Sequence, residues 1–296
     1  MFCATFNQSV TEINLKEMIF LDGIYSPSEV AERTVKSGIT KANLPLKKMI
    51  LLGIMAGAFI ALGGVASNVA VHNIDNVGIA RTLAGVIFPV GLMLVVFTGS
   101  ELFTGNCLML MSVLDKKIKV IQMIKNLFVV YFSNLVGALI IDFLVFFSGQ
   151  LDFSDGGLGA YTIKVALAKT SIAPTTAVVS GILCNILVCL SILLVTSAKD
   201  ATGKILAIFF PICAFVVCGF EHCVANMFYI PSGILAATNS HYVEKANELY
   251  GITAEQCAGL LHFQGIESFL FVTIGNIIGG SIFVAMIFYF SHKTKH

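Results

Sequence analysis

Long apolar runs separated by short charged segments dominate the pattern of this chain. A bilayer core about 30 Å thick needs roughly 20 apolar residues in a helix that crosses it. The second and fifth runs are too long for one helix, and charge interrupts each in its middle, at Glu101 and at Glu221 with His222. The pattern predicts six spans, at residues 49–71, 82–114, 126–147, 170–198, 205–240 and 268–291.

The composition supports an integral membrane protein. Of the 296 residues, 57% are hydrophobic and only 12% are charged, whereas soluble domains are about 25% charged. A surface with so little charge excludes a disordered chain, a nucleic-acid-binding protein and a secreted disulfide scaffold. Six of the eight cysteines lie inside the apolar runs, so we expect reduced thiols that pack as small apolar groups.

The distribution of lysine and arginine predicts the orientation. Fourteen of the 18 fall in segments on one side of the six spans and four on the other. Basic residues concentrate on the cytoplasmic side of a membrane, so we expect a multi-pass protein of the inner (plasma) membrane with both termini in the cytoplasm. The expected parts are a cytoplasmic N-terminal segment, a transmembrane domain and a cytoplasmic tail, at residues 1–45, 46–292 and 293–296.

The N-terminal segment contains a helix-start signal. Ser26 is a capping residue, Pro27 suits the first helical position and Glu29 the third, which predicts a helix through Lys41. We expect this helix to lie on the cytoplasmic membrane surface, or else to be a solvated helix without function. Its narrow apolar stripe consists of Val30, Val35 and Ile39.

An internal repeat relates the two halves of the chain. Gly, Glu and Asn recur in one register across the two interruptions, and the third and sixth spans share Asn134 and Asn276 followed by glycine. Because each half holds three spans, the halves are expected to have opposite topology, with the site between the two breaks. The recurring residues of the breaks are Gly99, Glu101 and Asn106 in the first half and Gly219, Glu221 and Asn226 in the second.

The breaks favour an anion as the substrate. Each exposes the N–H groups of a new helix start, and these groups with the helix dipole attract negative charge. Thr104 supplies a hydroxyl and His222 a titratable ring, while Glu101 and Glu221 are expected to bind backbone N–H groups or to support the loops. Alternatively, His222 is an interior hydrogen-bonded histidine and Thr104 a helix cap.

At these residues the chain resembles the formate/nitrite transporter family, over residues 27–290. The resemblance is carried by residues 101–104, 218–222 and 225–228. It implies an all-α, aquaporin-like fold of two inverted three-helix repeats and a homopentamer with one pore per subunit. It also implies roles for particular residues. Thr104, His222 and Asn185 fall at the pore centre, Phe88, Leu92 and Phe215 at the outer constriction, Leu102, Phe103 and Val188 at the cytoplasmic constriction, and Lys169 in the outer vestibule.

The resemblance therefore implies a passive channel for small monovalent anions of weak acids. The chain looks most similar to the hydrosulfide branch, with formate and nitrite also permeating, and we expect His222 to donate a proton to the anion. A proton-coupled formate or nitrite transporter remains the alternative. A metalloenzyme using Cys218 and His222 is disfavoured because no second ligand cluster completes a site. We expect no cofactor, no metal and no nucleic-acid partner, only lipid and small inorganic or organic anions.

Two acidic residues of the spans need a separate explanation. Asp142 lies within the third span and Glu267 at the edge of the sixth. A carboxylate exposed to lipid is costly, so we expect both at a subunit interface or in the headgroup region.

Overall fold

The computed structural model describes residues 23–292, and within them the chain is helical. The predicted tail, residues 293–296, and the first 22 residues of the N-terminal segment lie outside the described part. The α-helices are α2 (Pro27–Ala42), α3 (Leu46–Val71), α4 (Val77–Ile87), α5 (Val90–Thr98), α6 (Phe103–Asn106), α7 (Leu110–Leu114), α8 (Val120–Phe147), α9 (Gly157–Thr170), α10 (Pro174–Ser197), α11 (Ala201–Cys218), α12 (Cys223–Ala236), α13 (Ser240–Tyr250), α14 (Ala254–Leu261), α15 (Ser268–Ile278) and α16 (Ile287–His292). Short 3₁₀ turns at Cys107–Met109 and Gln150–Asp152 and a π-helical stretch at Gly279–Met286 complete them.

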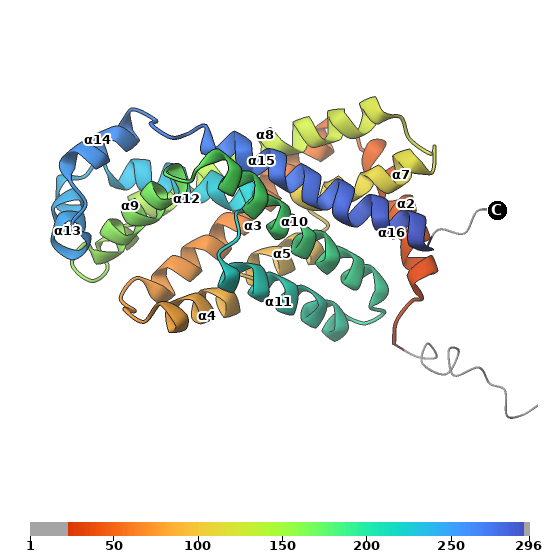
Figure 1. The fold of residues 1–296 in the computed structure, drawn as a ribbon, viewed down its shortest axis with the longest axis horizontal. Helices are drawn as coiled ribbons and strands as arrows, with labels where there is room; N and C mark the ends of the chain where they lie inside the picture. The colour runs from red at the N-terminus through yellow and green to blue at the C-terminus, as the bar shows by residue number, and fades with distance from the viewer. Residues whose placement is uncertain (1–22, 293–296) are drawn as a thin grey trace, which may run out of the picture.

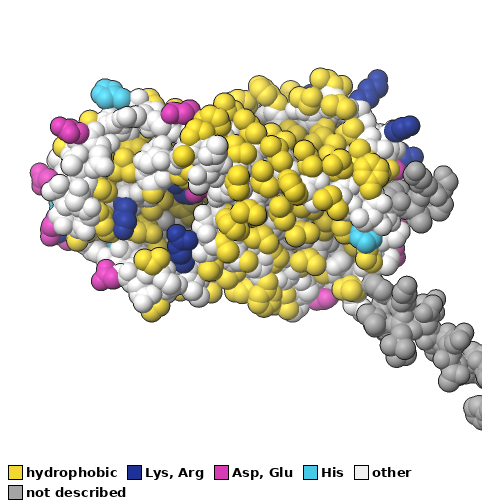
Figure 2. All heavy atoms as spheres, in the orientation of Figure 1, with side chains coloured by type: hydrophobic (Ala, Val, Ile, Leu, Met, Phe, Trp, Pro, Cys, Tyr) yellow, Lys and Arg dark blue, Asp and Glu magenta, His cyan; other side chains and the backbone are white. Residues whose placement is uncertain are grey.

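Six helical segments of the described chain are long and apolar enough to cross a membrane, which confirms the six predicted spans. The second span starts five residues earlier than predicted, and the fourth starts four residues later because residues 171–173 separate α9 from α10. Figure 2 shows a continuous hydrophobic surface across the middle of the molecule, with most charged side chains towards its two ends. The fold is therefore an all-α integral membrane fold.

Glycines let the long helices pack closely. Gly57 of α3 and Gly137 of α8 each contact the backbone of the other helix so closely that a Cβ atom would collide with a carbonyl group. Gly275 of α15 packs in the same way against the Val178 carbonyl of α10. Small residues at such crossings allow two helix backbones to approach within a membrane. Helix α3 thus packs closely on α8, and α10 packs closely on α15 in the same way.

The two interruptions predicted from charge are gaps between helices. Helix α5 ends at Thr98, Gly99 follows with a φ of 68°, and α6 begins at Phe103. Helix α11 ends at Cys218, Gly219 follows with a φ of 72°, and α12 begins at Cys223. Both glycines adopt the left-handed conformation that a side chain disfavours. At both breaks a glycine thus ends one helix, and a glutamate two residues later precedes the start of the next.

Three shorter helices cover one end of the molecule. Figure 1 shows α9, α13 and α14 together at the end opposite to α2 and α16, so the described chain begins and ends on the same side. Helix α9 precedes the fourth span, and α13 and α14 lie between the second break and the sixth span. The Tyr242 hydroxyl of α13 donates to Asp152 Oδ1, in the 3₁₀ turn before α9, at 2.6 Å. Burial and this carboxylate raise the pKa of Tyr242 to about 12.

The structure corrects the expectation for the N-terminal helix. Val30 and Val35 of α2 are buried against Leu108 and Met111 rather than lying on a membrane surface. The Ser112 hydroxyl donates to the Val35 carbonyl at 2.8 Å. The capping box of Ser26 and Glu29 is present as predicted. The apolar stripe is therefore a packing face within the protein.

Asp142 is also placed differently from the prediction. Its side chain is only 1% exposed, inside the protomer, and neither carboxylate oxygen has a hydrogen-bond partner among the described residues. A carboxylate avoids lipid by burial in protein as well as at an interface, and the sequence does not distinguish the two. Glu267 is exposed.

Candidate functional site

Three cavities follow one another through the molecule. One cavity, called the outer cavity after the expected orientation, is about 170 Å³, lies towards α9 and is lined by Tyr161, Lys169 and Tyr229 among others. The inner cavity, about 220 Å³, lies towards α2 and is lined by Lys41 and Ser100 among others. Between them lies a central chamber of about 10 Å³. The walls of the chamber consist of Ile60, Phe88, Leu92, Leu102, Val188, Ile212, Phe215 and His222.

The chamber shares walls with both larger cavities. Phe88, Phe215 and His222 also line the outer cavity, and Leu92 and Leu102 also line the inner one. The Phe88 and Phe215 rings meet edge to face, with their centroids 5.7 Å apart. The three cavities therefore form one series, closed at two apolar constrictions. A chamber of this volume holds about one water molecule.

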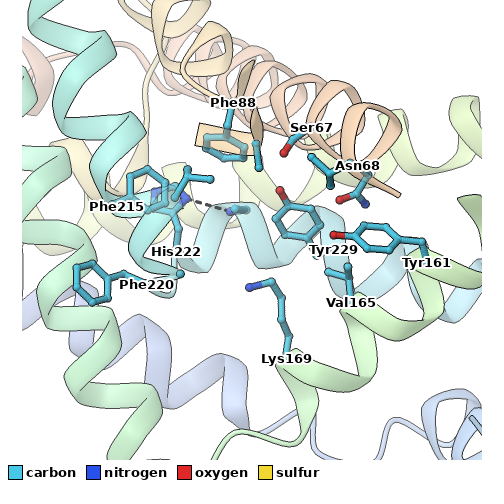
Figure 3. Close-up of a pocket in the computed structure, with 15 residues that line it drawn as sticks. Ser67, Asn68, Phe88, Tyr161, Val165, Lys169, Phe215, Phe220, His222 and Tyr229 are labelled. Atoms are coloured by element: carbon cyan, nitrogen blue, oxygen red, sulfur yellow. Dashed lines mark hydrogen bonds between the residues drawn. The ribbon is translucent and has the colours of Figure 1, made fainter. Parts of the chain in front are cut away.

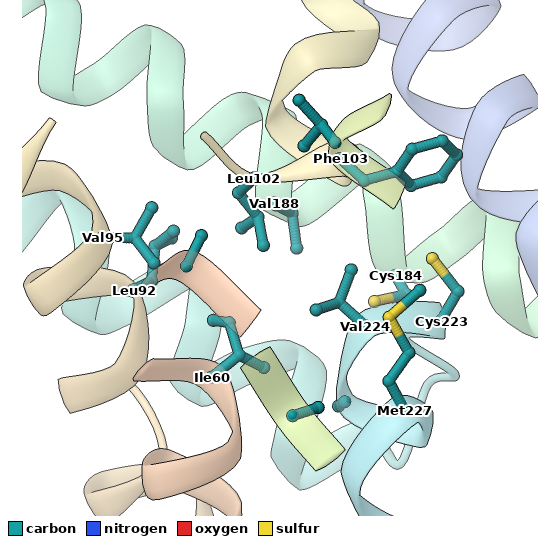
Figure 4. Packing of buried hydrophobic residues seen from close by; sticks show 14 of the residues in the cluster. Ile60, Leu92, Val95, Leu102, Phe103, Cys184, Val188, Cys223, Val224 and Met227 are labelled. Carbon is teal, nitrogen blue, oxygen red and sulfur yellow. The ribbon is translucent and has the colours of Figure 1, made fainter. Parts of the chain in front are cut away.

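The structure places five of the six predicted constriction residues on the chamber wall, namely Phe88, Leu92, Phe215, Leu102 and Val188. In Figure 4, Leu92, Leu102 and Val188 face a common space. Phe103 lies differently. Its ring points away from them in Figure 4 and packs against Tyr131, with centroids 4.8 Å apart.

His222 and Thr104 meet beside the chamber. His222 Nε2 lies 2.9 Å from the Thr104 hydroxyl, and both side chains are almost fully buried. His222 is also the N-cap of α12, because its Nδ1 accepts the backbone N–H of Ala225 at 3.0 Å (Figure 3). A nitrogen that accepts carries no proton, so this hydrogen-bond pattern assigns the neutral ring with its proton on Nε2. His222 therefore donates to Thr104.

Thr104 and Asn185 lie behind the chamber wall rather than on it. Each is 0% exposed, and neither lines any of the three cavities. The Asn185 amide donates to the backbone carbonyls of Asn276 and Thr104, at 2.6 and 3.3 Å. Asn185 thus fixes the backbone that presents Thr104 to His222.

Two asparagines hold the breaks in matching ways. Asn134 accepts the N–H of Phe103 and donates to the carbonyls of Gly53 and Glu101. Asn276 accepts the N–H of Cys223 and donates to the carbonyls of Gly181 and Glu221. Non-helical backbone within a membrane protein needs such partners because lipid offers none.

This bonding corrects the expected anion site. The N–H groups of Phe103, Cys223 and Ala225 were expected to face the substrate, but each donates to a side chain of the protein. These three N–H groups are therefore not free to bind an anion.

The two glutamates occupy equivalent positions in the two breaks. Glu101 accepts from the Asn106 amide at 2.7 Å and pairs with Lys41 at 2.7 Å. Glu221 accepts from the Asn226 amide at 2.8 Å and pairs with Lys169 at 2.9 Å. Their carboxylates bind side chains rather than the expected backbone N–H groups. Each nevertheless ties a loop to the helix that follows it.

Several residues of this site were not assigned a role from the sequence. Lys41 was predicted only as the end of a helix, although it lines the inner cavity and pairs with Glu101. Tyr161 and Val165 line the outer cavity from α9, beside the predicted vestibule residue Lys169. The spacing of four residues from Tyr161 to Val165 and from Val165 to Lys169 places the three on one helix face, and this spacing is the signal that could have found them.

The fold and the cavity series define a helical membrane protein with a closed path between its two ends. The formate/nitrite transporter family matches residues 28–290, and the chain belongs to this family. It is a family of transporters and channels, which confirms that the chain is not an enzyme. Among the described residues, no group of three His, Cys, Asp or Glu side chains is arranged to hold a metal ion.

Relatives match over nearly the whole chain. The uncharacterized transporter YrhG of Bacillus subtilis (strain 168) is 38% identical over 274 residues, which cover 91% of this chain and 94% of the relative. A probable formate transporter of Methanothermobacter thermautotrophicus is 37% identical over 288 residues, covering 91% and 98%. A solved structure of a pentameric formate channel with formate bound matches with a TM-score of 0.73 and 34% identity, covering 83% of this chain and 97% of that one.

Proposed function

We propose that this protein is a passive channel for small monovalent anions of weak acids, in the plasma membrane, with both termini in the cytoplasm. The observation that carries the proposal is the series of three cavities, with the buried pair of His222 and Thr104 beside its narrowest point. The similarity to a pentameric formate channel supports a homopentamer with one path in each subunit. In this proposal the chain has three parts: an N-terminal segment, residues 1–45; the channel domain, residues 46–292; and a short tail, residues 293–296.

A bare anion does not cross the two constrictions cheaply. Moving a carboxylate-sized ion into a medium of low dielectric costs of order 20 kcal/mol in an idealised Born estimate. The chamber wall is apolar except for His222, so little hydration is replaced there. Burial disfavours the charged form of an acid. The anion therefore takes up a proton, supplied by water from the solution that reaches the outer cavity, and passes Phe88 and Phe215 as the neutral acid.

The hydrogen bonds restrict the source of that proton. The neutral His222 has one proton, on Nε2, which it donates to Thr104. Charging the ring requires a proton on Nδ1 and breaks the bond from the Ala225 N–H, which caps α12. The hydrogen bond from His222 orients the Thr104 hydroxyl, so the hydroxyl proton points away from His222. His222 can donate a proton to the anion only after its ring is charged, and charging the ring opens the N-cap of α12.

Flux measurements on the purified protein in proteoliposomes test the proposal. Formate, nitrite and hydrosulfide are compared side by side over a pH series, in wild type and in His222→Asn. Asparagine is a good N-cap but does not titrate. If titration of His222 contributes to transport, H222N loses at least about ten-fold in flux and its remaining flux has a flatter pH profile. Wild-type flux and pH profile in H222N would limit His222 to the capping role.

The same vesicles separate a channel from a proton-coupled transporter. A channel only equilibrates the anion, whereas a symporter accumulates it against its gradient when a proton gradient is imposed. We expect no accumulation beyond the electrochemical equilibrium of the permeating species. Accumulation above that level would favour the proton-coupled alternative.

Hydrosulfide is the proposed preferred anion. It has one non-hydrogen atom, whereas formate and nitrite have three, and the chamber has room for about one water molecule. The relatives described above carry names for formate, so formate is the reference anion. At equal concentration of the neutral acid and after subtraction of flux through protein-free vesicles, we expect hydrosulfide to exceed formate. A lower hydrosulfide flux would reverse this order.

A further inference from the structure

The lysine of the outer cavity does not present a free positive charge. Lys169 Nζ lies 2.9 and 3.0 Å from the two oxygens of Glu221, and both side chains are largely buried. An ion pair at this distance has no net charge, and its field falls off faster than that of a single charge. Attraction of an anion from the solution must therefore come from another cation near the same cavity.

Arg81 occupies such a position. It is an exposed residue of α4, and Ala84, one turn further along the same helix, lines the outer cavity. Its guanidinium group lies against Gly219, another lining residue, because a Cβ atom on that glycine would come within 2.6 Å of Nη1. Arg81 is thus at the edge of the outer cavity.

The groups around Arg81 offset only a small part of its positive charge. Its Nη1 donates a long hydrogen bond of 3.4 Å to the Val217 carbonyl, at the end of α11. The carbonyl end of a helix carries roughly half a negative charge, which offsets only part of a full positive one. In the described part of the chain, no carboxylate lies within 4 Å of Arg81.

The other cations near this end of the molecule are held differently. The Lys164 ammonium group lies over the Tyr250 ring, 4.1 Å from its centroid, and does not line the cavity. Lys245 is paired with Asp155 and Glu248, and these hydrogen bonds raise its pKa. In Figure 2, Lys and Arg side chains lie in the recess of this end, while Asp and Glu side chains lie around its edge. An anion thus meets acidic groups before it reaches the cavity.

We propose that Arg81 is the cation that draws the anion from solution into the outer cavity, ahead of the neutralised Lys169. This assignment rests on the proposed channel function. Electrostatic steering of this kind raises the encounter rate and weakens as salt screens the charge.

The test uses formate flux in proteoliposomes at low substrate concentration, over a series of ionic strengths set with an impermeant sulfate salt. The variants are Arg81→Gln and Arg81→Lys, with Lys164→Gln for comparison and Lys245→Gln as the matched control. Arg81→Lys keeps the charge and changes the hydrogen-bonding geometry. It therefore separates charge from a structural role at Val217.

We expect R81Q to lower flux about three-fold to ten-fold at low ionic strength and to approach wild type at high ionic strength. R81K and K245Q are expected to stay within about two-fold of wild type throughout, since both keep a positive charge at position 81. Saturating formate should reduce the R81Q deficit, because encounter then no longer limits transport.

Each other outcome contradicts the assignment in a recognisable way. If R81Q equals wild type, or loses flux equally at every ionic strength, Arg81 does not act by attraction. If only K164Q shows the salt-dependent loss, the field belongs to Lys164. A wild-type protein that passes none of the three anions would contradict the proposed function itself, and this proposal with it.

Discussion

Asn134 and Asn276 determine the shape of the two breaks residue by residue. Each asparagine uses its carbonyl oxygen and both amide hydrogens, so its hydrogen-bonding capacity is almost fully used by backbone groups. Both side chains are 0% exposed. An unpaired polar group at this depth has no water to bind, and so the extended residues of each loop persist only while the asparagine is present.

Asn276→Leu is predicted to destabilise the protein and to close the path. The change leaves the Cys223 N–H and two carbonyl groups without their partner. A buried polar group left unpaired costs about 1–3 kcal/mol, but hydrogen bonds in membrane proteins average only about 0.6 kcal/mol, so we expect a loss of about 2–4 kcal/mol. Thermal unfolding in detergent measures the loss, and flux should fall with it.

Asn43→Ala is the matched control for this prediction. Asn43 is exposed and its amide donates only to the Ile39 carbonyl of its own helix, so its loss should leave the melting temperature nearly unchanged. Equal melting temperatures of N276L and wild type would show that Asn276 does not hold the break.

The residues at the breaks were partly predictable from the sequence. Repetition exposed Gly99, Glu101 and Asn134 together with their counterparts, because a repeated fold needs the same side chains twice. The partners were not predictable. Lys41 reaches Glu101 across 60 positions of the chain, and which of several lysines does so depends on how α2 packs. The family resemblance implied that Asn185 lies at the pore centre. It did not indicate that the Asn185 amide donates to the backbone carbonyls of Thr104 and Asn276.

At the scale of elements, α2 is joined to the membrane domain by polar and apolar contacts together. Its buried face packs on the helices after the first break, and Lys41 near its end pairs with Glu101 in that break. The predicted helix ends were accurate because caps are local signals. The surface that the helix covers was predicted wrongly, since an apolar stripe fits a membrane and a protein equally well.

The capping box predicts a pH dependence at the start of α2. Hydrogen bonds from the Ser26 backbone N–H and hydroxyl lower the pKa of Glu29. A carboxylate whose pKa is lower in the folded state stabilises the fold above its unfolded pKa, and this contribution is lost as the pH falls through the folded pKa. Hydrogen exchange of the first turn of α2, corrected for the intrinsic rate, should therefore quicken as the pH falls into that range.

Glu29→Gln is the control, because glutamine completes a capping box without titrating. We expect exchange of the first turn in E29Q to be independent of pH in the same range. A wild-type profile as flat as that of E29Q would contradict a role for the Glu29 charge.

At the scale of the whole molecule, the number of spans could be predicted from hydropathy, because the lipid bilayer sets the length and composition of a spanning helix. A helix satisfies its own backbone groups, so an apolar run of sufficient length becomes a span wherever it packs. The path does not follow from hydropathy in this way. It arises where Phe88 and Leu92 of the second span and Phe215 of α11 leave space between the breaks unfilled.

The orientation in the membrane is the remaining prediction at this scale, and it comes from charge alone. By sequence, 14 of the 18 basic residues fall in the segments that the six spans put on one side, which is the side of α2 and α16. The positive-inside rule predicts that this side faces the cytoplasm. Lys116→Cys, in the loop after α7, and Lys245→Cys, in α13, place matched thiols on opposite ends. A membrane-impermeant thiol reagent applied to intact cells should label K245C, and should label K116C only after permeabilisation, each measured above the wild-type background. The reverse pattern would place Arg81 and the outer cavity in the cytoplasm, so that the proposed attraction would act on anions leaving the cell rather than on those arriving.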